Sequence, residues 1–229
     1  MTDLDHATAR RYWRALVDNA ARLVADAHLL LDADSFARAR SLTVLAEEEL
    51  GKALTVYEVF SHGWSDGASG SLPLPDTGSR DHLAKYMAAF EFGRELEQFW
   101  GGGYEGQYPE DDDWEGWFAK RRAEAEDAAR GANRQKQRGF YVDLEGAEVR
   151  TPDDLDAGAV ADNLTRAAQV IEMMLIKDHT RMQDGPPERF DSTSVQQWTV
   201  MRTAHPDEFA DFLGRVRETA KDDGVLDDD

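Results

Sequence analysis

The sequence predicts an all-α protein, an antiparallel helical bundle with one short β-prone or extended segment near residues 139–151. Apolar residues recur at helical spacing along most of the 229-residue chain, which is the main sign of amphipathic helices. Polar or glycine-rich breaks separate these stretches, and no repeat of solenoid length is present. The expected helices span residues 8–31, 36–61, about 79–100, 114–137, about 153–182 and 207–221.

The first two expected helices are long and are joined by a short polar break, which predicts an antiparallel hairpin. Asp34 or Ser35 in that break can cap the second helix. The apolar stripe of the first helix consists of Tyr12, Leu16, Ala20, Leu23, Ala27 and Leu30. The stripe of the second helix consists of Leu42, Leu45, Ala46, Ala53, Val56 and Phe60.

The later helices are predicted from the same spacing. The third ends at three consecutive glycines, residues 101–103, and the fourth is rich in charged residues. The inward positions are His82, Tyr86, Ala89, Gly93, Leu96 and Trp100 in the third helix, Trp114, Trp117 and Phe118 in the fourth, Val160, Leu164, Ala168, Ile171 and Leu175 in the fifth, and Phe209, Phe212 and Val216 in the last. Residues 190–204 fit no single pattern.

The segment from Gly139 to Pro152 departs from the helical pattern. It is rich in β-prone residues around a Glu-Gly turn, which predicts a short extended segment or a small hairpin. The acidic stretch over residues 222–229 is predicted to be a disordered tail. Residues 1–221 are therefore expected to form a single helical domain.

The composition argues against several classes of protein. The chain has no cysteine, so it cannot build a disulfide framework or a zinc site on sulfur. Its formal net charge is −20, which argues against a broad nucleic-acid surface but not against a small local RNA site. The sequence shows no signal peptide and no stretch that resembles a membrane span. We expect a cytoplasmic protein with no membrane or DNA partner.

A group of polar residues is the candidate functional site. Glu49 falls within the apolar stripe of the second helix, where a carboxylate must be paired, hydrogen-bonded or protonated. His82 falls on the stripe of the third helix, and such stripes face one another in an antiparallel bundle, so we expect the two side chains to meet. The candidate cluster consists of Asp26, Glu48, Glu49, Lys52, His82, Lys85, Arg138 and Tyr141.

Two interpretations of this cluster remain open. In the catalytic one, His82 is a general acid or base that Glu49 orients, and basic residues of the cluster stabilise a phosphate or a developing negative charge. In the structural one, the cluster is a buried polar network that fixes the register of the bundle. The segment from Arg138 to Tyr141 would then only attach a loop to the helices.

Other sites have less support. The sequence lacks the Glu-x-x-His pairs of a di-iron bundle, a P-loop, a dinucleotide-binding fingerprint and a serine-nucleophile motif, so we expect no cofactor or metal. A group of aromatic residues could stack on bases, but its acidic surroundings favour packing or an interface between subunits. This group consists of Trp100, Tyr104, Tyr108, Trp114 and Trp117.

Four short stretches carry a family resemblance. They are Asn19-Ala-Ala-Arg-Leu-Val-Ala-Asp-Ala-His-Leu-Leu30, Ala46-Glu-Glu-Glu-Leu-Gly-Lys52, His82-Leu-Ala-Lys85 and Arg138-Gly-Phe-Tyr-Val-Asp143. In their order and rough spacing, residues 19–143 resemble the AbiV family of abortive-infection proteins, which belongs to the HEPN group of helical, often dimeric proteins. The resemblance implies a homodimer and a role in antiphage defence, in which the protein arrests host growth or translation during infection.

The resemblance leaves open whether the chain is an enzyme. Many HEPN proteins are ribonucleases that use an arginine and a histidine roughly four to six residues apart on a late helix. No arginine precedes His179 or His205 at that interval, and the match from Arg22 to His28 lies on the first helix and is taken as chance. RNA cleavage through Glu49 and His82 is one hypothesis. The alternative is a non-catalytic helical dimer that binds a phage or host protein.

The hypotheses imply different partners. Both include a second copy of the chain. The catalytic hypothesis adds RNA or the translation machinery, and the family resemblance adds a phage-encoded activator protein.

Overall fold

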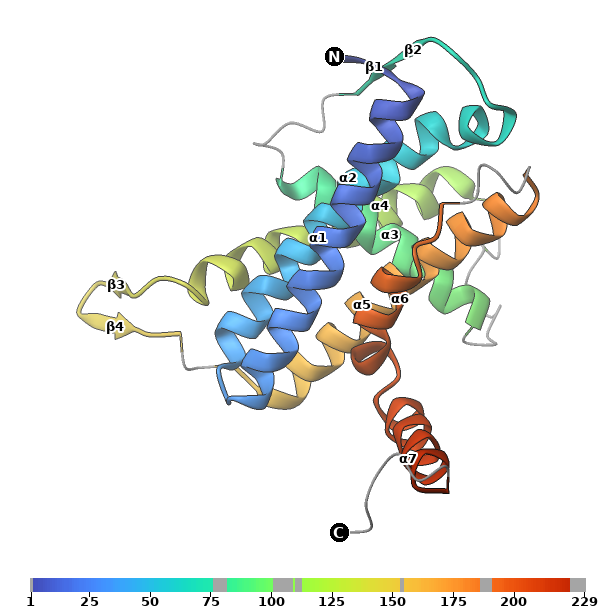
Figure 1. Cartoon of the computed structure of the whole chain (residues 1–229). Helices are drawn as coiled ribbons and strands as arrows, with labels where there is room; N and C mark the ends of the chain where they lie inside the picture. Colours follow the sequence, from blue (N-terminus) through green and yellow to red (C-terminus); the bar gives the residue numbers. More distant parts are fainter. Residues whose placement is uncertain are drawn as a thin grey trace.

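The computed structural model is all-α, as the sequence predicts (Figure 1). It describes residues 2–75, 82–100, 109, 113–152, 155–185 and 191–222, without the side chains of residues 96–100, 145 and 216–222. Within these ranges the helices are α1 (His6–Asp32), α2 (Phe36–Asp66), α3 (His82–Trp100), α4 (Trp114–Arg138), α5 (Ala157–Gln183), α6 (Ser194–Ala204) and α7 (Pro206–Asp222). The strands are β1 (Thr2–Asp5), β2 (Ser71–Leu74), β3 (Asp143–Glu145) and β4 (Glu148–Arg150). None of these helices combines the length and the hydropathy that a membrane span requires.

α1 and α2 form the predicted hairpin. Asp5 caps α1, because its carboxylate accepts a hydrogen bond of 2.8 Å from the backbone N–H of Thr8. In the turn, Asp34 adopts the left-handed conformation with φ of 57°, and Ser35 occupies the N-cap position of α2, although its side chain makes no capping hydrogen bond. The sequence thus placed the turn correctly, although α2 continues to Asp66, beyond its predicted end at residue 61.

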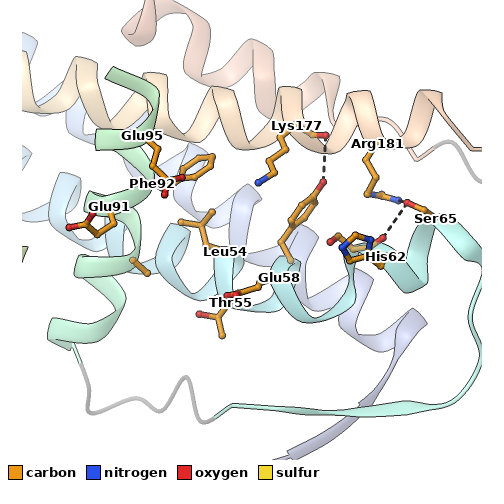
Figure 2. Close-up of a pocket in the computed structure, with 13 residues that line it drawn as sticks. Leu54, Thr55, Glu58, His62, Ser65, Glu91, Phe92, Glu95, Lys177 and Arg181 are labelled. Carbon is orange, nitrogen blue, oxygen red and sulfur yellow. Dashed lines mark hydrogen bonds between the residues drawn. The ribbon is translucent and has the colours of Figure 1, made fainter. Parts of the chain in front are cut away.

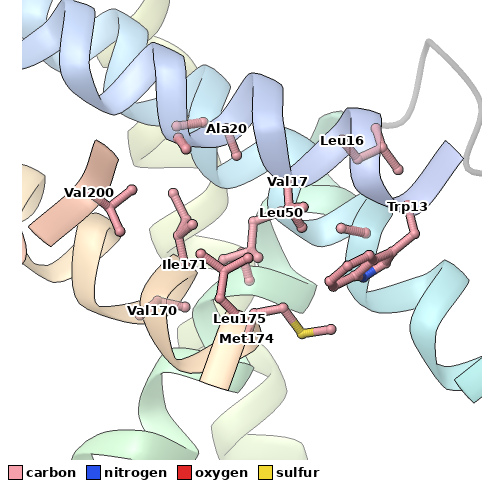
Figure 3. Close-up of a cluster of buried hydrophobic side chains, with 14 of the residues drawn as sticks. Trp13, Leu16, Val17, Ala20, Leu50, Val170, Ile171, Met174, Leu175 and Val200 are labelled. Carbon is pink, nitrogen blue, oxygen red and sulfur yellow. The ribbon is translucent and has the colours of Figure 1, made fainter. Parts of the chain in front are cut away.

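α2 is the central helix of the bundle, because it packs against α1, α3, α4 and α5. The main apolar core lies where α1, α2 and α5 meet, with α6 beside them (Figure 3). Its largest fully buried side chains include Trp13, Val17, Leu50, Phe60, Ile171, Leu175 and Val200. A second, smaller apolar cluster joins α2 to α3 and α4 through Val44, Tyr86, Ala129 and Ala132. α2 is therefore buried on two faces rather than along one stripe.

Two short sheets accompany the helices. β3 and β4 form the hairpin expected near residues 139–151, with Gly146 in its turn at φ of 66°. β1 pairs with β2 in antiparallel register, with Thr2 opposite Leu74. The sequence did not predict this second pair, because both strands are short and lie far apart in the chain.

Several expectations concern the remaining parts of the chain. The ambiguous stretch at 190–204 contains helix α6. The first residue of the fifth helix, α5, is Ala157, and Asp156 caps it through a hydrogen bond of 2.8 Å to the N–H of Ala159. The predicted starts of the third and fifth helices near residues 79 and 153, the glycines 101–103, and residues 223–229 of the predicted tail lie outside the described residues.

α3 packs across α2 (Figure 1). The two helices come closest at Gly51 of α2 and Lys85 of α3. A Cβ atom at residue 51 would lie 1.9 Å from the carbonyl oxygen of Lys85, so the absence of a side chain is what allows the two backbones to touch. The crossing places the residues just before it on each helix close together. These are Glu48 on α2 and His82 on α3.

We expect Gly51→Ala to lower the free energy of unfolding by about 1–2 kcal/mol or more. Overpacking against a backbone carbonyl costs about 1–3 kcal/mol or more, which exceeds the roughly 1 kcal/mol that alanine gains in helix propensity. The matched control is Gly131→Ala in α4, where a Cβ would meet no atom within 4 Å. This control should gain roughly 0.5–1 kcal/mol. Urea denaturation followed by circular dichroism measures both variants, and equal stabilities would contradict a backbone contact at Gly51.

Candidate functional site

The candidate site is a buried glutamate that binds a histidine and a lysine from two other helices. Glu48 of α2 places its Oε2 atom 2.8 Å from Nδ1 of His82 on α3. Its other oxygen, Oε1, accepts a hydrogen bond from Nζ of Lys136 on α4. The lysine Nζ also lies 3.4 Å from the histidine Nδ1. One carboxylate thus joins α2, α3 and α4.

The three side chains differ in their exposure to solvent. The Glu48 and Lys136 side chains are 7% and 9% exposed, whereas that of His82 is 45% exposed. An ionised carboxylate can only accept hydrogen bonds, so Nδ1 of His82 is assigned as the donor to Glu48. In the neutral ring, Nε2 is then the nitrogen that can accept a proton. Among the described residues, Nε2 has no hydrogen-bond partner.

The packing of α4 explains why Lys136 is buried. The inward positions of α4 are Ala125, Ala129, Ala132 and Lys136. The small alanine side chains allow α4 to lie close to α2, and Lys136 is the last inward residue of the series. The hydroxyl of Ser41 donates a hydrogen bond of 3.0 Å to the carbonyl oxygen of Lys136. Gly139 continues this contact, since a Cβ there would lie 2.0 Å from the Ser41 Oγ. The end of α4 is therefore fastened to α2 beside the site.

The prediction that Glu49 meets His82 was wrong. Glu49 is partly exposed and forms an ion pair with Lys52, one turn further along α2. The error arose because the helical wheel assumed one buried stripe, whereas α2 is also buried against α3 and α4, and that second face contains Glu48. Lys52 thus pairs with Glu49 and not with Glu48.

Three other members of the predicted cluster lie elsewhere. Asp26, Arg138 and Tyr141 are exposed, and among the described residues no hydrogen bond or ion pair joins them to Glu48, His82 or Lys136. Lys85 is buried one turn after His82, but no hydrogen bond joins it to Glu48 or His82. Sequence reasoning missed Lys136, although its spacing from the inward alanines of α4 was a usable signal.

A second buried polar group lies beside the first. Arg40 is buried and donates from Nε to Oε1 of Gln135 at 2.8 Å and from a terminal nitrogen to Oε2 of Glu47 at 3.3 Å. Burial raises the pKa of the Tyr86 hydroxyl to about 12, and the nearby Glu47 carboxylate contributes. Burial also raises the pKa of Glu47, although the positive charge of Arg40 acts to lower that pKa. This group again joins α2, α3 and α4.

A cavity of about 630 Å³ lies between α2, α3 and α5, beyond the point where α3 crosses α2 (Figure 2). In Figure 2 the Lys177 side chain points into it, and the Lys177 Nζ lies 5.7 Å from the centroid of the Tyr57 ring and 5.6 Å from that of Phe92. His82 does not line this cavity. The imidazole of the candidate site therefore faces the surface rather than this hollow.

Two other sequence expectations are resolved in part. Arg22 pairs with Asp18 at 2.9 Å, whereas Nδ1 of His28 lies 3.0 Å from Oγ1 of Thr203, so each has its own partners. In the aromatic group, Trp114 and Trp117 pack against each other with ring centroids 6.0 Å apart. Trp114 and Phe118 are exposed, so the prediction that they anchor the fourth helix in the core was wrong, and the buried positions of α4 are those of its alanines and Lys136. Tyr104, Tyr108 and the Trp100 side chain lie outside the described residues.

Comparison with known proteins identifies the family. The family model described as AbiV matches residues 8–172, which include α1 from its third residue, α2 to α4, the β3–β4 hairpin and most of α5. The protein is therefore a HEPN-like helical protein. It belongs to the AbiV family, whose general role is abortive-infection defence. Searches among curated proteins and among solved structures gave no match.

We expect Glu48→Ala to lower the free energy of unfolding by about 3 kcal/mol, because it leaves the buried ammonium of Lys136 without its carboxylate. Glu49→Ala is the matched control. It should cost less than about 1 kcal/mol, because its pair with Lys52 is partly solvated. Urea denaturation of both variants measures the difference. A larger loss in Glu49→Ala would contradict the assignment of Glu48 as the buried acid.

Tyr86 should make the stability fall at alkaline pH. Its pKa is about 12 in the folded protein against 10.0 for an ordinary tyrosine, so the unfolded chain loses this proton first. Stability is then fully present below about pH 10 and falls as the pH rises from 10 towards 12. Tyr86→Phe should reduce this slope, while Tyr141→Phe, at an exposed tyrosine, should not change it. Urea midpoints measured across this range test the expectation, and identical slopes for the two variants would contradict it.

Proposed function

We propose that this AbiV-family protein is an abortive-infection effector that arrests host growth by cleaving RNA needed for translation, with His82 as the catalytic residue. The observation that supports the proposal is the hydrogen bond of 2.8 Å from His82 Nδ1 to the buried carboxylate of Glu48. It orients a half-exposed imidazole and leaves Nε2 available for proton transfer. A carboxylate behind a histidine also stabilises the imidazolium that forms when the ring takes up a proton.

In the proposed step, Nε2 of His82 accepts the proton of an RNA 2′-hydroxyl while the 2′-oxygen forms a bond to the adjacent phosphorus. The bond from phosphorus to the 5′-oxygen of the next nucleotide breaks, and that oxygen takes a proton from water. The products are a 2′,3′-cyclic phosphate and a 5′-hydroxyl. The positive charge of Lys136, held next to the ring, would favour the negative charge that develops on the phosphate.

The proposal uses other residues than the arginine and histidine typical of HEPN ribonucleases. A short RNA segment suits it better than a long duplex, because the chain carries a net charge of −20. Lys136 on α4 supplies local positive charge 3.4 Å from Nδ1 of the imidazole. The proposed substrate is therefore a short, accessible stretch of RNA.

We expect His82→Ala to slow RNA cleavage by at least about 100-fold, the usual scale for loss of a general acid or base. Growth arrest on induction in bacteria should be lost with it. His205→Ala is the matched control, because it removes another histidine–glutamate pair, in which Nε2 lies 2.6 Å from Glu172. Gel analysis of cellular RNA, incorporation of labelled amino acids and circular dichroism measure cleavage, translation and folding. Unchanged RNA cleavage and arrest by folded His82→Ala would refute the catalytic proposal.

A second candidate function is the binding of a phage or host protein without catalysis. It is favoured by the apolar surface of the β3–β4 hairpin and the residues before it, which project from the bundle beyond α4 (Figure 1). The large exposed apolar side chains there are Phe140, Tyr141, Val142, Leu144 and Val149. Contiguous exposed apolar residues of this kind are typical of protein-binding surfaces.

The two functions separate in one experiment. If the protein acts by binding through the hairpin, Leu144→Asp combined with Val149→Asp should abolish growth arrest, while His82→Ala should retain it. The catalytic proposal expects the double variant to keep its RNA cleavage in vitro. In either case we propose a homodimer as the active form and a phage-encoded protein as activator. RNA or the translation machinery is the target in the catalytic case.

A further inference from the structure

The cavity between α2, α3 and α5 combines an apolar wall with charged side chains of both signs (Figure 2). Its volume of about 630 Å³ falls within the range of small-molecule sites, which is roughly 300–1,000 Å³. The apolar part of the wall consists of Leu54, Tyr57, Ala88 and Phe92. The proposed catalysis makes no use of this cavity, because His82 is not part of its wall.

Lys177 of α5 brings a positive charge into the cavity. Its Nζ lies 5.7 Å from the centroid of the Tyr57 ring and 5.6 Å from that of Phe92, and aromatic rings at such distances attract an ammonium group. Among the residues that the structure describes, no carboxylate forms an ion pair with Lys177. Arg181 differs, because it is paired at 2.8 Å with the buried carboxylate of Asp178. Lys177 is therefore the cation that can bind an anionic group of a ligand.

Two glutamates of the cavity wall also have no ion-pair partner within the described part of the chain. They are Glu58 of α2 and Glu95 of α3, and both are exposed. The third glutamate of the wall, Glu91, is bound by Arg121 at 2.7 Å. The cavity thus offers one ammonium group and two carboxylates to a ligand. A ligand that carries charge of only one sign would be attracted by one kind of group and repelled by the other.

The basic and acidic side chains are separated along the cavity. In Figure 2 Arg181 and His62 lie at the right-hand end, whereas Glu91 and Glu95 lie at the left-hand end. Lys177 extends into the space between the two ends. A ligand with a negative group and a positive group at different positions matches this separation of charge.

We propose that the cavity binds a small zwitterion, an α-amino acid with an aromatic side chain. The ligand carboxylate binds Lys177, and the ligand ammonium group lies towards Glu58 and Glu95. The aromatic ring of the ligand packs on the apolar wall, where Phe92 offers a ring for an aromatic contact. A nucleotide fits less well, because its phosphate would share the cavity with three glutamates. The inference goes beyond RNA cleavage and does not rest on it.

Isothermal titration calorimetry of the full chain with L-phenylalanine tests the class of ligand. Saturable binding is expected at concentrations up to about 10 mM. Phenylpropionate lacks the ammonium group and phenethylamine lacks the carboxylate, so each should bind at least about ten-fold more weakly than L-phenylalanine. Absence of binding by L-phenylalanine, or equally tight binding of either analogue, would overturn the proposal.

Substitutions of the two kinds of charge test the location of the site. Lys177→Met should weaken the binding of L-phenylalanine at least about ten-fold, and Glu58→Gln combined with Glu95→Gln should do the same. The matched control is Lys120→Met, at an exposed lysine of α4 that is not part of the cavity wall, and it should bind as wild type does.

Circular dichroism establishes that each of these variants is folded. Wild-type affinity in folded Lys177→Met or in the folded double glutamine variant would contradict the assignment of the cavity. An equal loss in Lys120→Met would contradict it as well, because that lysine lies on a helix that does not line the cavity.

Discussion

The backbone contact between Gly51 of α2 and Lys85 of α3 is the constraint on which the candidate site depends. Because residue 51 has no side chain, α3 lies directly on α2, and the residues three positions earlier on each helix, Glu48 and His82, come within hydrogen-bond distance. α4 then packs against the same site through its inward alanines and places Lys136 beside Glu48. The identity of one residue thus decides whether acid, imidazole and ammonium meet. Glycine costs helix propensity at this position, but its lack of a side chain permits the backbone contact.

Much of the fold could be predicted from the sequence, because each long helix carries its own apolar spacing. The α1–α2 hairpin, the β3–β4 hairpin and the helical class are confirmed. The helical-wheel prediction for α2 failed at the site for a physical reason. A helical wheel identifies one buried face, but a central helix with four neighbours is buried on more than one face. Distinguishing Glu48 from Glu49 requires knowing which side α3 crosses. That is set by contacts between segments distant in the chain, such as Gly51 with Lys85.

The two buried polar groups show how structural and chemical roles overlap. Arg40 with Glu47 and Tyr86, and Glu48 with His82 and Lys136, both join α2, α3 and α4. Both help to specify the position of α3 and α4 on α2. They differ in that the first is largely buried, while the second ends in a half-exposed imidazole. A network that fixes a bundle can therefore also hold a proton-transfer group still, and rigidity is what such a group requires.

The antiparallel pairing of β1 with β2 bears on the order in which the chain assembles. β1 is synthesised before α1 and α2, but its partner, residues 71–74, is synthesised only after both helices. Closing this pair therefore encloses the complete α1–α2 hairpin, so the hairpin has to form first for the two strands to come within reach. The strand that precedes α1 thus ties down the chain shortly before α3 begins. On a translating ribosome, β1 therefore stays unpaired until both helices have been synthesised, and only then does it pair with the strand that precedes His82 in the chain.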